Sequence, residues 1–524
     1  MALSEIGARR GATMALFALF PVAYHFSNPF FFRRFVGIQS LGNKAVFLMF
    51  HAVAFLCLLG VAFASKKVFY SFSIVSFLSI LLDNCFFFVK HYAITLDDLS
   101  VLFVSAGNVT EAISEFREDL LRAFVTASFV LLCLMVLRQL VRKRRYASHL
   151  VLTLTSISFC FYLIIAVYRG EPSLVGLPSN YTLLFGGPVL SLDSVIQDFK
   201  TPKPFVAARR EAPLFESVRH IILIIDESVE GERFRELNTQ PFTNAVDYGF
   251  ALSGANCSAA SNLILRVGPD ESALSKTILS TPTLFELAKQ ANFKTVYFDL
   301  QGVLSDTAVR DYFSKRELAS VDQVYHPTDF GKKNFEWDVG FAERFPGLLS
   351  KETRVFAIAN KTGTHFPYAS NLPPNLAGTA DPYGASVTLS TVAFLHKIDS
   401  TLPDSTIVFY TSDHGQTFSA KSRHCNGASD STLSEWRVPL IVFTSKDLAP
   451  IRQALNSSWN NLASHFELSE TIRVLLGYQP MFNKTLFDPP NNLPNRYRAY
   501  FGPIKGLLGR PPSFREFDRS ALGT

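Results

Sequence analysis

The sequence predicts a chain in two parts: an N-terminal domain of five transmembrane helices and a C-terminal α/β domain with a mainly parallel sheet. Two observations support this prediction. Hydrophobic residues make up 48% of the 524 positions, and apolar segments concentrate in the first third of the chain. From His220 to about Tyr478, runs of β-branched residues alternate with segments of helical pattern. Such alternation is typical of parallel sheets that are covered by helices on both faces.

The first third of the chain contains five apolar segments, each close to the ~20 residues that a helix needs to cross a bilayer. They are Gly11–Phe31, Ala45–Ala64, Val68–Val89, Leu120–Leu140 and His149–Val167. Pro21, His25 and Pro29 interrupt the first segment, which leaves a cleaved signal peptide or an interfacial helix as alternatives for it. Because no small-residue cleavage site follows this segment and four more spans do, we expect a protein anchored in the membrane.

Basic residues predict the orientation of these spans. Arg9 and Arg10 precede the first span, Lys66 and Lys67 follow the second, and a dense basic cluster at 142–145 follows the fourth. Positive residues flanking membrane spans tend to remain in the cytoplasm. Five spans with this charge pattern place everything after about residue 169 on the outer side of the membrane.

The predicted domains follow from this topology. Residues 1–169 form the transmembrane domain, residues 170–217 a linker or amphipathic segment, and residues 218–524 the outer domain. The part of the outer domain after Pro480 is rich in Pro, Gly, Asn and Arg, and we expect irregular coil there. The net charge of +6 mainly reflects topology, and no motif for binding nucleic acid is present in the sequence.

Three strand-like runs of the outer domain end abruptly on side chains that bind metals or react. The runs are His220–Ile225, followed by Asp226 and Glu227; Thr406–Ser412, followed by Asp413 and His414; and Arg354–Ala359, followed after a short loop by His365. Ligands of open parallel sheets bind beyond the carboxyl ends of the strands. Carboxylates and imidazoles gathered there suit a divalent metal ion, and zinc fits best. The sequence therefore predicts a metalloenzyme.

A run of small residues at 253–262 offers hydroxyl groups for this chemistry, including those of Ser258 and Ser261. Such a run can turn into a helix N-terminus, where the helix dipole favours a bound phosphate. A metal ion can activate a hydroxyl at this point for attack on phosphorus or sulfur. Cys257 and Cys425 are the two cysteines of the outer domain, and a disulfide between them remains open at this stage.

Taken together, these motifs resemble those of the bacterial phosphoethanolamine transferases, members of the alkaline phosphatase and sulfatase superfamily. The resemblance extends from the first span to about Tyr478, and its most specific motif is Ser412-Asp-His-Gly-Gln416. It implies an alkaline-phosphatase-like α/β domain in the periplasm, joined to a multi-pass anchor in the bacterial inner membrane. It also implies one or two zinc ions as cofactor.

The resemblance assigns roles to residues of the metal site. Glu227, Asp413 and His414 map onto zinc ligands of the family. Ser261 maps onto the nucleophile, whose oxygen is also a zinc ligand, because Cys257-Ser-Ala-Ala-Ser261 matches the Cys-x-x-x-Thr pattern of the family. Ser258 remains an alternative nucleophile.

Further roles concern the substrate. His365 maps onto a phosphate-side histidine, and His424 onto a later loop histidine; both are expected to act in catalysis and in substrate binding. Glu111 maps weakly onto a glutamate near the substrate pocket and is a candidate for substrate binding. Asp226 stands where the family has Gly, and it is a candidate for an additional or competing metal ligand.

The activity implied by the resemblance is a metal-dependent transfer of phosphoethanolamine. The donor is phosphatidylethanolamine, and the acceptor is lipopolysaccharide, at lipid A or a core sugar, or another envelope glycan; a covalent phospho-serine forms between the two steps. Two alternatives remain open, a phosphoglycerol transferase of the same fold and a degenerate domain that serves as a membrane scaffold. Sulfatase activity is excluded, because Cys257 is not followed by the required x-Pro-x-Arg.

Overall fold

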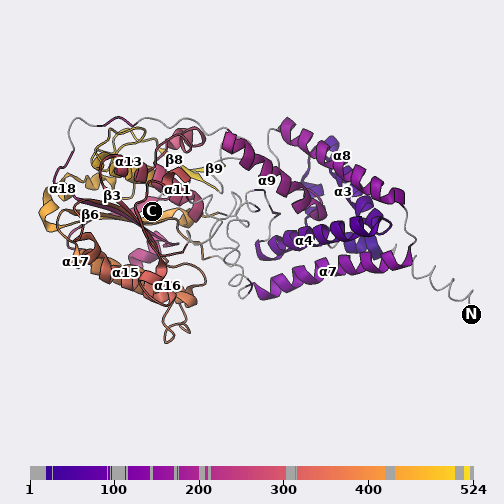
Figure 1. Cartoon of the computed structure of the whole chain (residues 1–524), viewed down its shortest axis with the longest axis horizontal. Coiled ribbons are helices and arrows are strands. Elements are labelled where there is room, and N and C mark those ends of the chain that lie inside the picture. Colours follow the sequence, from indigo (N-terminus) through magenta and orange to yellow (C-terminus); the bar gives the residue numbers. More distant parts are fainter. Residues whose placement is uncertain are drawn as a thin grey trace, which may run out of the picture. The chain divides into compact units, whose positions relative to one another are not determined.

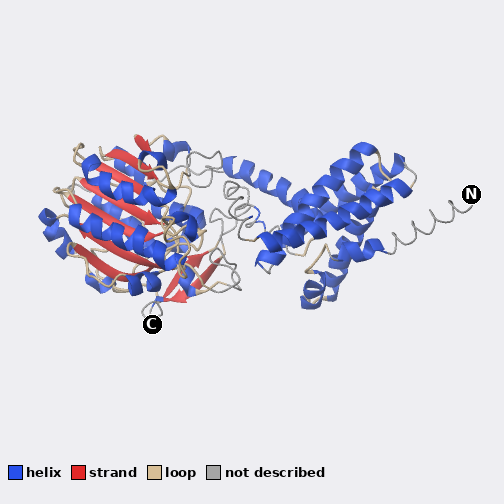
Figure 2. Cartoon of the chain, turned by 90° about the horizontal axis from the view of Figure 1, so that it is seen from below, coloured by secondary structure: helices blue, strands red, loops and turns tan. Residues whose placement is uncertain are grey.

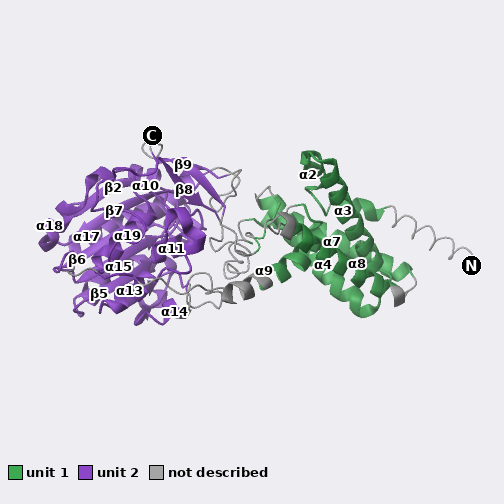
Figure 3. Ribbon diagram, turned by 90° about the horizontal axis from the view of Figure 1, so that it is seen from above, with its two compact units in different colours: residues 1–200 green, residues 201–524 purple. Residues whose placement is uncertain are grey.

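The computed structural model describes most of the chain, with gaps at the N-terminus and in several loops. The described residues are 19–25, 27–90, 93–94, 96, 99, 113, 116–141, 145–169, 174, 176–199, 207–209, 214–302, 313, 315–418, 431–501 and 513–519. They belong to two compact units, residues 1–200 and 201–524, coloured separately in Figure 3. Figure 2 shows that the first unit is helical and that the strands lie in the second.

Four described helices of the first unit are long and apolar enough to cross a membrane. They are α3 (Leu41–Val61), α4 (Lys66–Lys90), α7 (Arg117–Leu140) and α8 (Arg145–Arg169), and the short helix α2 (Phe31–Gly37) precedes them. These four helices correspond to the second to fifth predicted spans. Of the first predicted span, residues 11–18 and 26 lie outside the described residues, and residues 19–25 are helical. The chain is therefore a membrane protein with a helical anchor, as the sequence predicted.

The segment predicted as a linker, 170–217, contains ordered structure that packs in the first unit. A 3₁₀ turn, η2 (Ser179–Tyr181), leads directly into α9 (Thr182–Phe199), and both contact α4. The backbone N–H of Ser179 donates to Asn28 Oδ1, and that of Leu183 donates to Ser79 Oγ. These bonds satisfy groups at a helix start that have no partner within the helix.

The second unit is built on a seven-stranded sheet with the order β2-β7-β6-β1-β5-β3-β4. The strands are β1 (His220–Asp226), β2 (Ala245–Leu252), β3 (Lys294–Asp299), β4 (Gln323–Tyr325), β5 (Val355–Asn360), β6 (Thr406–Ser412) and β7 (Arg437–Thr444). Only β7 runs against its neighbours. Every residue of β1, β5 and β6 is buried, which explains their continuous apolar sequence. The predicted α/β fold with a mainly parallel sheet is confirmed.

Helices cover both faces of this sheet (Figure 1). One face packs against four helices: α11 (Ser258–Val267), α13 (Leu284–Gln290), α18 (Ala449–Ala454) and α19 (His465–Leu475). The other face packs against α10 (Gly231–Leu237), α15 (Asn334–Leu349), α16 (Pro382–Ser386) and α17 (Ala393–Thr401). A π-helical turn at Val387–Val392 connects α16 to α17. The short helix α12 (Leu274–Thr277) follows α11, and α14 (Lys315–Leu318) precedes β4.

The tail after Pro480 is not wholly irregular, contrary to the sequence prediction. It contains an antiparallel pair, β8 (Arg496–Tyr500) and β9 (Phe514–Asp518). Tyr497 of β8 is fully buried, and its hydroxyl donates to the carbonyl of Ser253, in the run of small residues before α11. Each strand has only 5 residues, and they lie in a tail rich in Pro, Asn and Arg, so the alternation in β8 is too short to be recognised in sequence.

Candidate active site

Two neighbouring strands place two carboxylates and an imidazole at one edge of the sheet. Glu227 follows the last residue of β1, and Asp413 and His414 follow the last residue of β6. Because the two strands are parallel, with Asp226 beside Ser412, these side chains leave the sheet at the same level. The ligand atoms of Glu227, Asp413 and His414 all lie within 4.8 Å of one another, and all three residues are buried. The structure thus brings together the three predicted metal ligands.

Hydrogen bonds orient the side chains of Asp413 and His414 in this cluster. Asp413 Oδ1 accepts from the backbone N–H groups of Ser228 and His414, at 3.0 and 2.7 Å, while the buried Oδ2 has no hydrogen-bond partner. His414 Nδ1 lies 2.8 Å from the carbonyl of Gly415. A proton on Nδ1 satisfies that carbonyl and leaves the lone pair of Nε2 facing Glu227 Oε1 at 3.7 Å. Partners of this kind fix the tautomer of metal-binding histidines.

The electrostatics of the cluster favour a cation. Burial and the charge of Glu227 raise the pKa of Asp413 to about 7. Burial lowers the pKa of His414, but the carboxylates of Asp413 and Glu227 outweigh it and raise that pKa overall. Two buried carboxylates that face each other destabilise their charged forms, and a bound cation removes this cost. One oxygen from each of two carboxylates and one imidazole nitrogen, with Asp413 Oδ2 unpaired and buried, fit a zinc ion.

Two hydroxyls contact this cluster: that of Ser228, which donates to Glu227 Oε1 at 2.7 Å, and that of Ser258. Ser258 Oγ lies 3.1 Å from His414 Nε2 and 3.3 Å from both carboxylate oxygens of Glu227. Ser258 is the first residue of α11, and Cys257, in extended conformation, precedes it as the N-cap. The hydroxyl therefore meets the metal-binding side chains at a helix N-terminus, where unpaired N–H groups favour an anion such as phosphate.

Ser261, predicted to be the nucleophile and a metal ligand, is placed elsewhere. Its hydroxyl donates to the backbone carbonyl of Asp413 and lies 3.1 Å from His465 Nδ1. Ser261 stands three residues after Ser258, about one helical turn deeper into the fold, and its side chain is fully buried. The spacing of the family motif selected Ser261, but in the structure the hydroxyl that contacts Glu227 and His414 from α11 is that of Ser258, at the start of the helix.

His365 lies in the loop that follows β5 and is half-buried. The carbonyl of His365 accepts from Asn371 Nδ2 at 2.6 Å, and its N–H donates to the carbonyl of Thr362. Burial raises the pKa of Glu227, but the charges of His414 and His365 outweigh this and lower it. The predicted phosphate-side histidine is thus close enough to Glu227 to act on it electrostatically.

Three predicted residues lie outside the described residues: Glu111, His424 and Cys425. Their predicted roles stay predictions. Cys257 is disulfide-bonded, whereas the four cysteines of the membrane unit are free. A disulfide at the N-cap of α11 fixes the backbone beside Ser258.

Asp226, considered as an additional metal ligand, has a structural role in the described site. Its Oδ2 accepts from Lys361 Nζ at 2.7 Å, Thr391 Oγ1 at 2.8 Å and Tyr410 Oη at 2.9 Å, and Asp226 is fully buried. Lys361 also lies 3.7 Å from Asp338 Oδ2. Asp226 Oδ1 accepts from the backbone N–H of Glu227 at 3.0 Å, so both oxygens of Asp226 have hydrogen-bond partners, and Asp226 is not among the three residues whose ligand atoms cluster.

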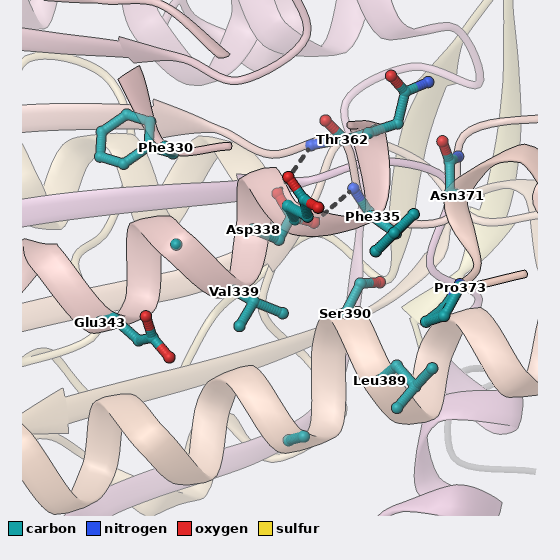
Figure 4. Close-up of a pocket in the computed structure, with 15 residues that line it drawn as sticks. Phe330, Phe335, Asp338, Val339, Glu343, Thr362, Asn371, Pro373, Leu389 and Ser390 are labelled. Carbon is teal, nitrogen blue, oxygen red and sulfur yellow. Dashed lines mark hydrogen bonds between the residues drawn. The ribbon is translucent and has the colours of Figure 1, made fainter. Parts of the chain in front are cut away.

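The loop after β5 connects this buried ion pair to the cluster. Asp338, on α15, accepts from the N–H groups of Thr362 and Gly363, as Figure 4 shows. The same figure shows Asp338 on the wall of a cavity of about 500 Å³ that lies behind the loop. Thr364 completes the connection, because its hydroxyl donates to the carbonyl of Glu227 at 2.7 Å.

Gly363 is required where this loop crosses β1. Its φ is +51°, and a Cβ there would collide with Asp226 Oδ1 and come within 2.8 Å of Glu227 N. We expect Gly363→Ala to shift Glu227, lower metal occupancy and reduce the free energy of unfolding by about 1–3 kcal/mol. Metal analysis and denaturant unfolding of the purified protein measure both effects. Gly378→Ala is the matched control, since a Cβ there meets nothing within 4 Å; equal behaviour of the two variants would contradict this account.

Sequence reasoning missed two residues that support the site. Gln301 donates to Glu227 Oε2 at 3.1 Å and to the carbonyl of Lys361 at 2.7 Å. Gln301 follows the carboxyl end of β3, so the rule that ligands bind beyond the carboxyl ends of parallel strands could have identified it. His465, on α19, lies against Ser261, and burial lowers its pKa to about 3. No sequence signal separates His465 from an ordinary core histidine.

Comparison with known proteins supports this description of the second unit. Residues 253–478 match the family model described as Sulfatase. The match covers less than half of the chain and shows that this part of the second unit is similar to that family. The matched residues include Ser258, Asp413 and His414, whereas Glu227 lies N-terminal to them. Among curated proteins, no relative matches this chain at a significant level.

Solved structures similar to this chain include two from bacterial envelope proteins. The integral membrane protein lipooligosaccharide phosphoethanolamine transferase A (EptA) from Neisseria meningitidis matches with a TM-score of 0.57 at 13% identity, over 90% of this chain and 97% of that one. The periplasmic domain of EptC from Escherichia coli, solved in complex with zinc, matches 61% of this chain and 97% of that domain, with a TM-score of 0.48 at 16% identity. The EptA match extends the shared fold to the membrane unit.

Proposed function

We propose that this protein is a metal-dependent phosphotransferase that transfers phosphoethanolamine from phosphatidylethanolamine to an envelope acceptor. The observation that carries the proposal is the contact of Ser258 Oγ with His414 Nε2 and Glu227 in the buried cluster. A hydroxyl, three metal-ligand side chains and a helix N-terminus meet at one point. Zinc would be held by Glu227, Asp413 and His414, and when bound it supplies Lewis acidity that lowers the pKa of the Ser258 hydroxyl.

The chain's own residues suit two successive transfers. In the first, Ser258 Oγ attacks the phosphorus of the donor, an Oγ–P bond forms, and the P–O bond to diacylglycerol breaks. The proton of the hydroxyl leaves with the diacylglycerol oxygen. In the second, an oxygen of the acceptor attacks the same phosphorus, its proton returns to Ser258, and the Oγ–P bond breaks. The N-terminal N–H groups of α11 stabilise negative charge on the phosphoryl oxygens in both steps.

Histidines of the loops serve proton transfer and phosphate binding in this proposal. His365, in the loop after β5, is half-buried and close to Glu227, which suits a group that meets a negatively charged substrate. His424 is assigned the same kind of role by the family resemblance, and Glu111 is assigned to substrate binding. Imidazoles near the reacting group commonly donate a proton to the leaving oxygen.

The proposed setting is the bacterial inner membrane, with the second unit in the periplasm. The helical anchor supports this setting, because it keeps the enzyme at the surface where a phospholipid donor lies. The acceptor we propose is lipopolysaccharide, at lipid A or a core sugar, or another envelope glycan. EptA from Neisseria meningitidis, a lipooligosaccharide phosphoethanolamine transferase, shares the fold, which supports this choice of acceptor.

The test uses the purified full-length protein with phosphatidylethanolamine or phosphatidylglycerol of identical acyl chains. We expect diacylglycerol release and a phosphoethanolamine adduct on the peptide that contains Ser258, found by mass spectrometry. A phosphoglycerol adduct instead would assign the protein to the phosphoglycerol transferases. Failure of both donors to release diacylglycerol from protein that contains metal would contradict the proposed activity and favour a membrane scaffold.

A further inference from the structure

The C-terminal hairpin β8–β9 lies outside the residues that match the family model, which end at residue 478. It nevertheless lies beside α11, the helix that begins with Ser258 (Figure 1). Ile264 of α11 belongs to the same buried apolar cluster as Tyr497 and Ala499 of β8. The steps proposed above use no residue of this hairpin, so its contacts around α11 call for an explanation of their own.

The first strand of the hairpin pairs with the buried segment between β2 and α11. Backbone groups of a buried segment need hydrogen-bond partners, and this segment belongs to no strand of the main sheet. The N–H of Tyr500 donates to the carbonyl of Gly254 at 3.1 Å, and the N–H of Asn256 donates to the carbonyl of Tyr500 at 3.4 Å. The hydroxyl of Tyr497 donates to the carbonyl of Ser253 at 2.8 Å. Thus β8 serves as the neighbouring strand of the segment that leads into α11.

The same segment is connected to the residues that follow β6. Asn256 Nδ2 donates to Glu435 Oε2 at 2.9 Å. The carbonyl of Glu435 accepts from the N–H of Gly415 at 2.9 Å, and Gly415 directly follows the metal-ligand candidate His414. A shift of the segment before α11 would therefore move the attacking hydroxyl relative to the metal-binding side chains.

A buried arginine anchors the second strand of the hairpin. Arg519 directly follows β9 and is only 4% exposed. Its Nη2 lies 3.1 Å from Glu271 Oε2 and 3.2 Å from Glu467 Oε1, and its Nη1 donates to the carbonyl of Leu462 at 2.8 Å. The guanidinium also lies 5.4 Å from the ring centroid of Tyr497. Because removal of this cation leaves buried carboxylates without a partner charge, Arg519 fixes the hairpin to α19 and to the chain before α12.

We propose that the hairpin is a working part of the active site, in which Tyr497 and Arg519 are positioning residues for Ser258. They hold the segment before α11 and thereby direct the Ser258 hydroxyl at the metal-binding side chains. The inference deepens the proposed function, on which the attack by Ser258 rests. A displacement of a reacting group by about 1 Å can lower a rate by about a hundredfold, so the loss of one hydrogen bond behind Ser258 is expected to reduce turnover measurably.

The first test is steady-state diacylglycerol release from phosphatidylethanolamine by the purified full-length protein. Tyr497→Phe removes one hydroxyl and keeps the ring. We expect it to lower kcat by about ten- to a hundredfold, with the KM for the donor and the zinc content unchanged. Tyr248→Phe is the matched control, because Tyr248 is also fully buried and its hydroxyl has no hydrogen-bond partner among the described residues. The control should behave as the unmodified protein.

The arginine is tested in the same assay. Arg519→Met should lower kcat at least as much as Tyr497→Phe does. Arg519→Lys should recover part of the loss, because it keeps the charge but lacks the planar fork of donors. Arg496→Met, at a side chain of β8 that is 73% exposed, is the control and should leave kcat unchanged. If Arg519→Met does not fold, Tyr497→Phe decides the question by itself.

Hydrogen exchange measured by mass spectrometry gives a readout that does not depend on catalysis. In Tyr497→Phe, the peptide that contains residues 253–258 should exchange about three- to tenfold faster, while peptides of β1, β5 and β6 exchange as in the unmodified protein. Unchanged exchange of the first peptide, or an unchanged kcat, would overturn the inference.

Two further outcomes separate the inference from a general effect on folding and from the proposed function. Faster exchange across the whole sheet, or loss of zinc in parallel with kcat, would overturn the inference, because the hairpin would then act on the fold as a whole. Localised faster exchange in a protein whose unmodified form transfers no phosphoethanolamine would support the hold of the hairpin on this segment and refute the transfer reaction.

Discussion

Ser258→Ala is expected to abolish the covalent phosphoethanolamine adduct and to lower turnover by at least about a thousandfold. The reason is geometric: among the two serines of α11 that sequence motifs offered, only Ser258 directs its hydroxyl at Glu227 and His414. The alanine removes the attacking oxygen and leaves the three proposed metal ligands in place. Diacylglycerol release and intact-protein mass spectrometry measure the two effects.

Ser261→Ala is the matched control, three residues along the same helix. It should keep the adduct, although it loses the hydrogen bond to the carbonyl of Asp413 and its contact with His465. We expect a loss of about 1–3 kcal/mol in the free energy of unfolding from this buried change. An adduct that persists in Ser258→Ala and vanishes in Ser261→Ala would reverse the assignment and restore the nucleophile predicted from the family motif.

The second large effect concerns the buried lysine behind the site. Lys361→Met should lower the free energy of unfolding by about 3–5 kcal/mol, because it leaves buried carboxylates without their cation. Lys361 and Asp226 are both fully buried, 2.7 Å apart, and Asp338 lies 3.7 Å from the same ammonium. The loop after β5, which contacts Glu227 through Thr364, should become less ordered in this variant, so metal occupancy should fall too. Denaturant unfolding of the full-length protein measures the loss.

Two comparisons separate this mechanism from a simple loss of packing. The double variant Lys361→Met/Asp226→Asn removes the unpaired charge and should recover part of the lost stability. Lys289→Met breaks an ion pair with Asp322 that is largely exposed, and such pairs contribute at most about 1 kcal/mol. If the two lysine variants lose equal stability, the buried pair has no special role.

Much of the fold could be predicted from sequence because its signals are local. β1, β5 and β6 are fully buried strands with continuous apolar sequence, and α3 has the length and hydropathy of a membrane span. The meeting of Glu227 with Asp413 and His414 followed from one topological rule, that parallel strands share their carboxyl-terminal edge. The structure realises it by pairing β1 directly with β6.

The remaining features depend on contacts that no local pattern carries. The choice between Ser258 and Ser261 depends on where α11 begins, and helix boundaries are uncertain by one or two residues even in known structures. From sequence, Asp226 is a candidate metal ligand, because its partner Lys361 lies 135 positions away and only the fold brings the two together. Asp83 lies in a predicted span, and its hydrogen-bond partner Ser179 lies in the segment that the sequence predicted to be a linker, so no local pattern connects the two.

The most direct measurement is the metal content of the purified full-length protein and of three variants. Elemental analysis after dialysis should find about one zinc ion per chain in the unmodified protein. Asp413→Asn and His414→Gln should lose most of it, and Ser258→Ala should keep it, since three protein ligands suffice for a catalytic site. Unmodified protein that transfers phosphoethanolamine with no bound metal, or Asp413→Asn protein that retains its full metal content, would contradict the account.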